Sequence, residues 1–143
     1  MHEDTIESVV GEMGYEGHRI TPLRRGIIGI FLSRKTPLSA DEVTTILKTR
    51  KIAFHKASLY RELEFLLDWK FLEKVLFGDG TTRYETSWHK HHHHLVCTSC
   101  STSVDVEFPE APLEKVAEAA ATKHSFSINS HSLEFFGLCQ KCQ

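Results

Sequence analysis

The chain of 143 residues has no long hydrophobic segment. No stretch approaches the roughly 18 consecutive apolar residues that a membrane-spanning helix needs. The first ten residues, MHEDTIESVV, are acidic and have no apolar centre of the kind found in a secretory signal. We therefore expect a cytoplasmic protein that has no membrane partner.

Cysteine is scarce, and all four cysteines fall in two Cys-x-x-Cys pairs: Cys97, Cys100, Cys139 and Cys142. In a reducing compartment such pairs bind metal more often than they form disulfides, although redox disulfides remain the alternative. Four thiolates suit a closed tetrahedral zinc site, which stabilises the fold and leaves no open position for catalysis. Because 38 residues separate the pairs, the zinc would join a strand to the C-terminal tail.

The chain also lacks a strong excess of charge of either sign, since its net charge is -2. The distribution is uneven, however. Residues 17–61 contain ten Lys or Arg and only two acidic residues, a local net charge of +8. The first part of the chain is therefore basic enough to bind nucleic acid, and the acidic remainder conceals this in the total.

The first half has the pattern of three helices followed by a hairpin. Helix starts are predicted at Thr21-Pro22, at Ser39 with Glu42 as a capping box, and near Lys56. Two strand-like runs, 71–77 and 82–86, flank the turn Gly78-Asp79-Gly80. This order is typical of a winged helix-turn-helix. A generic helical domain is the alternative, and the basic segment favours the DNA-binding version.

The pattern of the second half predicts a strand at 91–97 and a second strand at 104–108. A helix from Pro112 onward and an extended segment at 126–136 follow them. About fifty residues are few for an independent core, so a metal or a partner subunit is expected. The predicted fold class is thus α+β. A winged helix-turn-helix domain (1–86) and a hinge (87–90) precede a small α/β dimerisation domain (91–143) with the four-cysteine zinc site.

Five of the ten histidines lie in the run His89-Lys90-His91-His92-His93-His94. The run lies inside the chain, whereas a purification tag would lie at a terminus. On a strand, His91 and His93 would face one side and His92 and His94 the other, so the run could supply two metal sites. A solvated strand with incidental metal affinity is the alternative. Candidate partners are Glu85, Asp105, Glu107, Glu114 and His131.

The third predicted helix carries side chains suited to DNA. If Leu59 marks its buried face, Arg61 lies roughly opposite and Tyr60 on the flank. Arg can read guanine in a major groove, and Tyr can contact phosphate or a thymine methyl. Arg19 and Arg24 could bind the backbone or the minor groove. An ordinary solvated helix face is the alternative.

Several motifs together resemble the ferric uptake regulator (Fur) family of metal-responsive repressors. They cover nearly the whole chain: Arg19-Ile-Thr-Pro-Leu-Arg24, Leu38-Ser-Ala-Asp-Glu-Val43, Ala57-Ser-Leu-Tyr-Arg61, Arg83-Tyr-Glu85, His91-His-His-His-Leu-Val-Cys97-x-x-Cys100, His131-Ser-Leu133 and Cys139-x-x-Cys142.

The resemblance implies a role for each group of residues. The four cysteines would hold structural Zn²⁺. Glu85 with His92 and His94 would form the regulatory site at the hinge, with Asp105 as a further candidate. A further site in the dimerisation domain would take His91, His93, Glu114 and His131. Tyr60 and Arg61 would contact DNA from the recognition helix and Arg19 would reach the minor groove; Ser58 and Arg24 are our further candidates for DNA contacts.

The chain departs from the family pattern at three places. Residues 34–38, RKTPL, contain no His, where many members supply one to the regulatory site. His93 stands where iron-type members commonly have Asp. Ser101 replaces a usual Gly after the second cysteine.

The function implied is a homodimeric, metal-dependent repressor of metal homeostasis or peroxide-stress genes that binds a palindromic double-stranded DNA operator. The regulatory metal would be Zn²⁺ or Fe²⁺, with Mn²⁺ and Ni²⁺ as further options. We expect no enzymatic activity and no organic small-molecule substrate. Two alternatives are a zinc-dependent hydrolase, for which no HExxH motif is present, and a metal buffer or chaperone without DNA binding.

Overall fold

The computed structural model describes residues 5–88 and 91–143. The chain divides into two compact units, Met1–His89 and Lys90–Gln143, and each is described by itself. The hinge predicted at 87–90 falls partly on residues 89 and 90, which lie outside the described residues.

Side-chain hydrogen bonds cap the starts of three of the four helices in the first unit, and the fourth, which follows His55, has no such cap. Thr21 caps α2 by accepting a hydrogen bond from the Arg24 backbone N–H (3.1 Å), and Pro22 takes the first helical position. The predicted capping box between Ser39 and Glu42 is confirmed at the start of α3. The helices are α1 (Ile6–Tyr15), α2 (Pro22–Leu32), α3 (Ala40–Thr49) and α4 (Lys56–Asp68).

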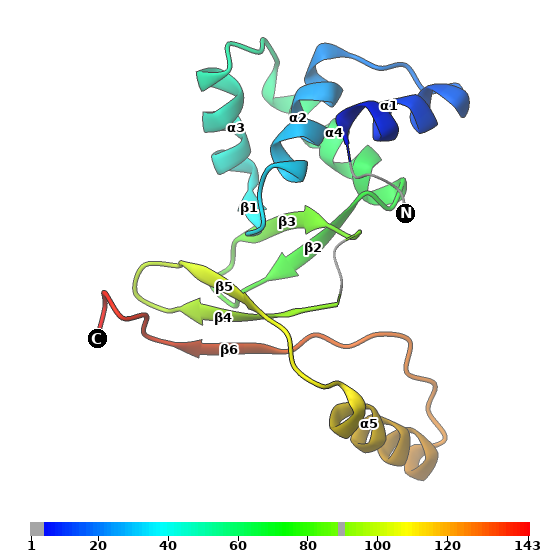
Figure 1. The fold of residues 1–143 in the computed structure, drawn as a ribbon, viewed down its shortest axis with the longest axis vertical. Helices are drawn as coiled ribbons and strands as arrows, with labels where there is room; N and C mark the ends of the chain where they lie inside the picture. The colour runs from blue at the N-terminus through cyan, green and yellow to red at the C-terminus, as the bar shows by residue number, and fades with distance from the viewer. Residues whose placement is uncertain (1–4, 89–90) are drawn as a thin grey trace. The chain divides into compact units, whose positions relative to one another are not determined.

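A small antiparallel sheet completes this unit (Figure 1). Its strands are β1 (Leu38–Ser39), β2 (Leu72–Leu76) and β3 (Thr82–Thr86), in the order β1-β3-β2. The predicted hairpin is β2 with β3. Its turn uses Gly78 (φ 75°) and Gly80 (φ 77°), whose positive φ values suit glycine. Helices followed by this hairpin give the winged helix-turn-helix that the sequence predicts.

The core of the first unit joins all four helices to the hairpin. Fully buried side chains include Met13, Phe31, Leu47, Leu63 and Phe71, one from each of the four helices and one from the segment before β2. Helix α1 was not among the predicted helices, although its buried residues Val9, Val10 and Met13 follow a helical spacing. The unit therefore has a core of its own, which holds α4 in place.

The second unit is a three-stranded sheet with one helix. The strands are β4 (His93–Cys97), β5 (Ser103–Val106) and β6 (Glu134–Gly137), and the helix is α5 (Ala111–His124). Strand β4 lies in the centre, antiparallel to β5 and parallel to β6. The strand predicted at 91–97 begins two residues later than expected, and only the end of the segment 126–136 is a strand.

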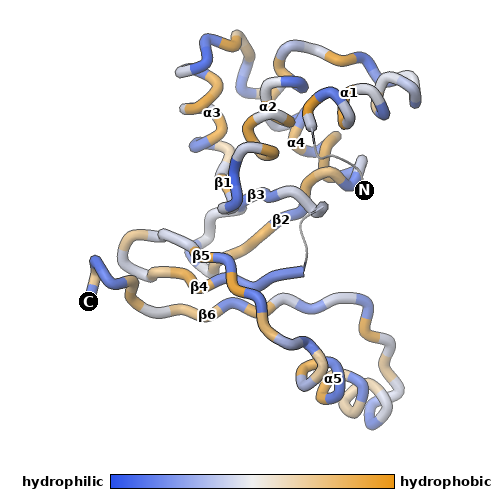
Figure 2. Tube along the Cα trace, viewed as in Figure 1, coloured by the Kyte–Doolittle hydropathy of each residue, from blue (hydrophilic) through white to orange (hydrophobic). Residues whose placement is uncertain are grey.

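This unit buries few apolar side chains. Among its described residues, only Val96 and Cys97 are buried members of the hydrophobic class, and α5 contributes no buried residue. Large apolar side chains stay exposed, including Val116 at 67% and Phe126 at 69%. Figure 2 shows hydrophobic and hydrophilic positions alternating along α5. The unit thus depends on something beyond its own apolar packing.

None of the helices in the described ranges 5–88 and 91–143 is long and apolar enough to span a membrane.

Candidate metal sites and DNA-binding surface

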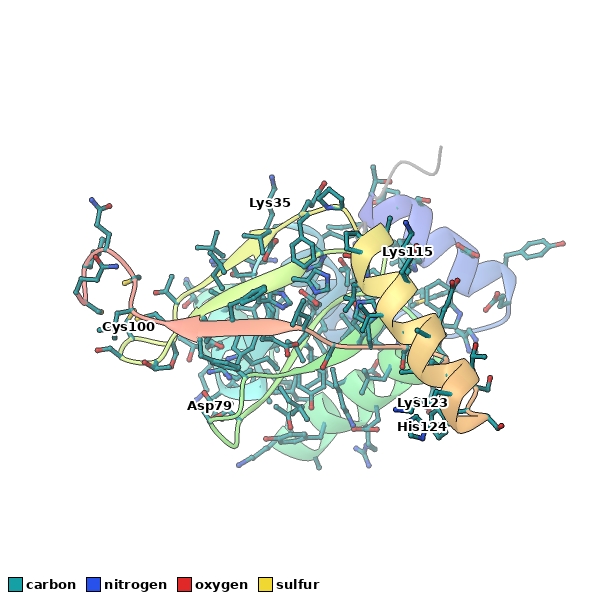
Figure 3. The ribbon with its side chains drawn as sticks, turned by 90° about the horizontal axis from the view of Figure 1, so that it is seen from below. Lys35, Asp79, Cys100, Lys115, Lys123 and His124 are labelled. Carbon is teal, nitrogen blue, oxygen red and sulfur yellow. The ribbon has the colours of Figure 1, made fainter. Side chains whose placement is uncertain are left out.

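The four cysteines lie together at one end of the second unit. Cys97 ends β4 and Cys100 lies in the turn after it, while Cys139 and Cys142 belong to the C-terminal tail beyond β6. Figure 3 shows Cys100 next to that tail. Backbone bonds hold the two segments in contact, because the Thr98 N–H donates to the Gly137 carbonyl at 2.9 Å.

The arrangement of the sulfur atoms fits zinc. All four Sγ atoms lie within 4.8 Å of one another, and the Cys100 and Cys139 sulfurs are 3.8 Å apart. A Zn–S bond of about 2.3 Å in a tetrahedron places the sulfurs roughly 3.8 Å apart. The cysteines form no disulfide. The donor set and the spacing therefore suit a closed structural zinc site.

Hydrogen bonds to sulfur favour the thiolate form that a metal requires. The Cys139 backbone N–H donates to Cys97 Sγ (3.4 Å), and this bond is the main cause that lowers the pKa of Cys97 to about 6. The hydroxyl of Thr102, 3.2 Å from Cys100 Sγ, lowers the pKa of Cys100. The Ser99 side chain lowers the pKa of Cys142, but hydrogen bonds with the other three thiols together raise it to about 12, so the thiolate is favoured only in the first pair.

The odd-numbered histidines gather around one carboxylate. The group is His91, His93, Glu110 and His131, whose ligand atoms all lie within 4.8 Å of one another. Glu110 Oε1 is 2.7 Å from His93 Nε2 and 3.7 Å from His91 Nε2, and Glu110 Oε2 is 3.6 Å from His131 Nε2. Three imidazole nitrogens and a carboxylate thus converge from β4 and the residues just before it, from the start of α5 and from the segment before β6.

The hydrogen-bond geometry of His93 favours a cation in this group, either a proton or a metal ion. His93 is 2% exposed, and its Nδ1 donates to the Leu133 carbonyl at 3.1 Å. In a neutral ring, Nε2 would then carry a lone pair that faces the Glu110 carboxylate. The two groups would repel each other unless a proton or a metal lay between them. Glu110 Oε2 is buried and accepts no hydrogen bond from the described residues. A divalent metal with histidine and carboxylate ligands satisfies both atoms.

The carboxylate in this group differs from the predicted one. Glu114 lies one turn further along α5, is exposed, and is not among the gathered ligand atoms. Glu110 immediately precedes α5 and takes its place. The sequence pattern did not single out Glu110, because the distance from the strand to the helix depends on the path of residues 107–110.

The even-numbered histidines form a separate pair. The rings of His92 and His94 are 4.9 Å apart at 82°. His94 pairs across the sheet with Asp105, and Asp105 Oδ1 lies 3.8 Å from His94 Nε2. That oxygen is buried and accepts no hydrogen bond from the described residues. Glu85 lies in the first unit, on β3 opposite Glu73 of β2, so its membership of a site with this pair stays a prediction.

The predicted DNA-reading side chains lie at the start of α4. Tyr60 is 41% exposed and Arg61 is exposed, as the helical periodicity predicts. Ser58 is half-buried, and its hydroxyl accepts a hydrogen bond from Arg61 Nη2 at 3.2 Å. Arg19 is exposed on the segment before α2. These four side chains belong to one unit that has its own core.

Arg24 differs from the other predicted DNA contacts. Its guanidinium donates to both carboxylate oxygens of Glu62 and lies 3.8 Å from the centre of the Phe65 ring. The Arg24 side chain is only 12% exposed. Its donors are thus occupied within the unit, which sequence periodicity could not indicate.

Comparison with known proteins gives concordant matches. The sequence model described as "Ferric uptake regulator family" matches residues 15–136. The chain is 33% identical over 145 residues to the ferric uptake regulation protein of Bacillus subtilis (strain 168), covering 98% of this chain and 95% of that protein. It is 28% identical over 141 residues to the peroxide-responsive repressor PerR of Staphylococcus aureus (strain USA300), covering 99% and 93%.

A solved structure has the same fold. The Helicobacter pylori ferric uptake regulator Fur, described as having three functional metal binding sites, superposes with a TM-score of 0.79. The superposition covers 96% of this chain and 93% of the Helicobacter pylori chain. The two sequences are 24% identical, so the likeness concerns the fold alone.

Proposed function

Because the chain belongs to the ferric uptake regulator family, we propose that it is a cytoplasmic, metal-dependent repressor that binds a palindromic operator as a homodimer. Members of this family are metal-responsive transcription regulators and not enzymes, which excludes the zinc-hydrolase alternative. The observation that carries the proposal is the combination, in one chain, of exposed Tyr60 and Arg61 on a winged helix with clustered metal ligands in a second unit.

The proposed structural ion is Zn²⁺, held by the four cysteines. For the regulatory site we propose Glu85, His92 and His94, with Asp105 as a further ligand. Glu85 comes from the first unit and the two histidines from the second, so an ion bound by all three favours one arrangement of the units. A hundredfold preference for the DNA-binding arrangement corresponds to roughly 2.7 kcal/mol, which is enough to switch a weak binder.

The remaining cluster, His91, His93, Glu110 and His131, is proposed as a second divalent metal site. It joins the start of β4 to the start of α5 and to the segment before β6. Its ligands all belong to the second unit, so we propose that the ion bound there keeps the dimerisation domain folded. The metal of both sites is proposed as Zn²⁺ or Fe²⁺, with Mn²⁺ and Ni²⁺ as further options.

The dimer is supported by the surface of the second unit. The family binds DNA as dimers, and this unit exposes apolar side chains that one copy cannot cover. A two-fold dimer presents two α4 helices to successive major grooves of a palindrome. Residues Ser58, Tyr60, Arg61 and Arg19 are the proposed DNA contacts.

The test is operator binding under anaerobic conditions with buffered Zn²⁺, Fe²⁺, Mn²⁺ and Ni²⁺ supplied separately. A duplex selected by the metal-loaded protein from a random pool serves as the probe. His92→Ala and Glu85→Ala are expected to abolish the metal dependence while the dimer stays folded. His124→Ala, which removes an exposed histidine at the end of α5, is the matched control. Unchanged metal dependence in His92→Ala would sink the regulatory assignment.

The variant Arg61→Ala distinguishes a repressor from a metal buffer that does not bind DNA. A repressor loses the gel shift in this variant and keeps its metal content, because Arg61 belongs to the first unit and lies in neither cluster of the second. A wild-type protein that binds no duplex with any of the four metals would favour the buffer.

A further inference from the structure

One face of α4 is attached to the segment that carries Arg19. Glu62, Phe65 and Trp69 are spaced at i, i+3 and i+7, so they lie along one side of the helix. We call these three residues the α4 stripe. Each of them contacts a side chain between residues 16 and 24.

The strongest attachment is the contact between Arg24 and Glu62. Arg24 Nε donates to Glu62 Oε2 at 2.7 Å, and Nη2 donates to Glu62 Oε1 at 3.3 Å, which is a bidentate pair. The two side chains are only 12% and 16% exposed. The Phe65 ring covers the guanidinium at 3.8 Å. Removing either partner would therefore leave a largely buried charge without compensation.

The same guanidinium also binds the backbone of Arg19. Arg24 Nη1 donates to the Arg19 carbonyl at 2.8 Å. The Arg19 side chain is exposed and no described residue binds it. Arg24 thus connects Glu62, which follows Arg61 directly on α4, with the backbone from which the Arg19 side chain projects.

Two further contacts keep this segment on the stripe. The His18 ring meets the Phe65 ring edge-on, with centroids 5.0 Å apart. Trp69 Nε1 donates to the Glu16 carboxylate at 2.7 Å. The segment is therefore attached along nearly two turns, from Glu62 to the C-cap Trp69 of α4, and the Arg24 pair is the attachment nearest the proposed DNA contacts.

Helix stability does not explain this position of Arg24. A cation in the first turn of α2 meets the positive end of the helix dipole, which is unfavourable. Its three sets of contacts all lead outside α2, to Glu62, Phe65 and Arg19.

We propose that Arg24 and Glu62 are positioning residues, which hold the backbone of Arg19 in register with the recognition helix α4. Neither side chain touches DNA. Their effect on affinity passes through Arg19, whose groove contact must be made together with that of Arg61. The inference rests on the proposed DNA-binding function and deepens it.

A double-mutant cycle in duplex binding tests this pair. The full-length, metal-loaded protein is titrated with the selected duplex in four forms: wild type, Arg24→Gln, Arg19→Ala and the double variant. We expect Arg24→Gln to weaken binding about tenfold in the wild-type background and less than about twofold in the Arg19→Ala background. In the Arg19→Ala background, Arg24→Gln should leave the dependence of duplex affinity on salt unchanged, because this substitution removes no phosphate contact.

The matched control is Arg25→Gln, which removes the same charge from the adjacent position of α2. Arg25 binds Glu7 of α1 and makes no contact with the α4 stripe. Its effect should be the same with and without Arg19. If near-ultraviolet circular dichroism shows Arg24→Gln to be unfolded, Glu62→Gln takes its place in the cycle, because it keeps the volume and one acceptor.

Two results of the double-mutant cycle would overturn the proposal, and one result without any variant would do so too. A loss that is equal in both Arg19 backgrounds, with a salt slope reduced by about one, would make Arg24 a direct phosphate contact. An equal loss with an unchanged slope and a lowered melting temperature would make the pair structural only. A wild-type protein that binds no duplex with any metal overturns the proposed function first, and this inference with it.

Discussion

At the scale of single residues, the tip of the β2–β3 hairpin is organised around Asp79. Its carboxylate accepts hydrogen bonds from Arg83 Nη1 (3.0 Å), Arg83 Nη2 (2.7 Å) and the Thr81 backbone N–H (3.0 Å). Arg83 also lies over the Phe77 ring at 4.9 Å. The hairpin tip therefore has a fixed shape, and the charge of Arg83 is neutralised within it.

This contact predicts an unusual titration. The Arg83 hydrogen bonds first, and the Thr81 N–H second, lower the pKa of Asp79 to about 2. Because the pKa is lowered on folding, the pair stabilises the hairpin above about pH 4, and this contribution is lost as the pH falls from about 4 to about 2. Carboxyl NMR should find Asp79 still ionised near pH 3. Arg83→Gln should raise its midpoint, and a wild-type midpoint near 4 would contradict the assignment.

The histidine cluster allows a second residue-scale prediction. Glu110→Gln should weaken the second metal site at least about tenfold, because the anionic oxygen among the three imidazoles is lost. Glu114→Gln removes the same charge one turn away and should leave the affinity unchanged. Competition titration with Co²⁺, after the thiolate site has been filled with Zn²⁺, measures the difference. Equal effects of the two variants would return Glu114 to the site.

Residue types and local spacing predict much of these sites. The Cys-x-x-Cys pairs and the odd-even alternation of His91 to His94 need only the sequence, and the structure brings the four sulfurs together. The choice of Glu110 over Glu114 depends on where α5 starts relative to β4. The burial of Arg24 depends on Glu62, which is 38 residues away in sequence. Such contacts follow from tertiary packing, which periodicity does not encode.

At the scale of elements, capping residues predict helix starts better than strand patterns predict strand ends. The starts of α2 and α3 follow capping residues, whereas α4 has no side-chain cap and follows the spacing of its apolar residues, and the β2–β3 hairpin follows its glycine turn. Helix α1 carries comparable signals, since Thr5 caps it and Val9, Val10 and Met13 form its buried face. Strand β4 begins at His93 because its partner β5 ends at Val106, and no local signal marks that limit.

A strained residue directly follows the second cysteine of the first pair. Ser101 has φ 59°, in the left-handed region that favours glycine, and its N–H donates to the Cys97 carbonyl at 2.9 Å. Ser101→Gly should therefore stabilise the zinc-loaded protein by about 1 kcal/mol. Chemical denaturation measures the gain. Ser127→Gly, at an exposed position without positive φ, should give no gain, and equal effects would refute the strain.

At the scale of the whole molecule, the two units differ in how they are stabilised. The first has a continuous apolar core, while the described part of the second buries mainly histidine, cysteine and Val96. A sheet with one uncovered helix requires metal and a partner surface to stay folded. The second unit is thus the part of the chain where metal binding, folding and dimerisation are expected to be linked.

This difference predicts which face forms the dimer. Val116 on α5 is 67% exposed within one chain, and a two-fold dimer would bury it twice. Val116→Asp should weaken the dimer at least about a hundredfold, because two apolar side chains are lost from the contact. Analytical ultracentrifugation measures it. Thr122→Asp adds the same charge at another exposed position of α5, about 120° around the helix from Val116, and should leave the dimer intact. A dimer unaffected by Val116→Asp would place the contact elsewhere.

Metal and operator must also affect each other equally, since coupling between two binding sites is reciprocal. If the regulatory metal tightens duplex binding about a hundredfold, saturating duplex must tighten metal binding about a hundredfold as well. Chelator-buffered metal titrations with and without the selected duplex measure this ratio. His92→Ala should remove the coupling in both directions. Glu110→Gln should keep it, because the ligands of the second metal site all belong to the second unit and cannot join the two units of one chain. A metal affinity that saturating duplex leaves unchanged would mean that the bound ion does not prefer the DNA-binding arrangement, and the proposed switch would fail.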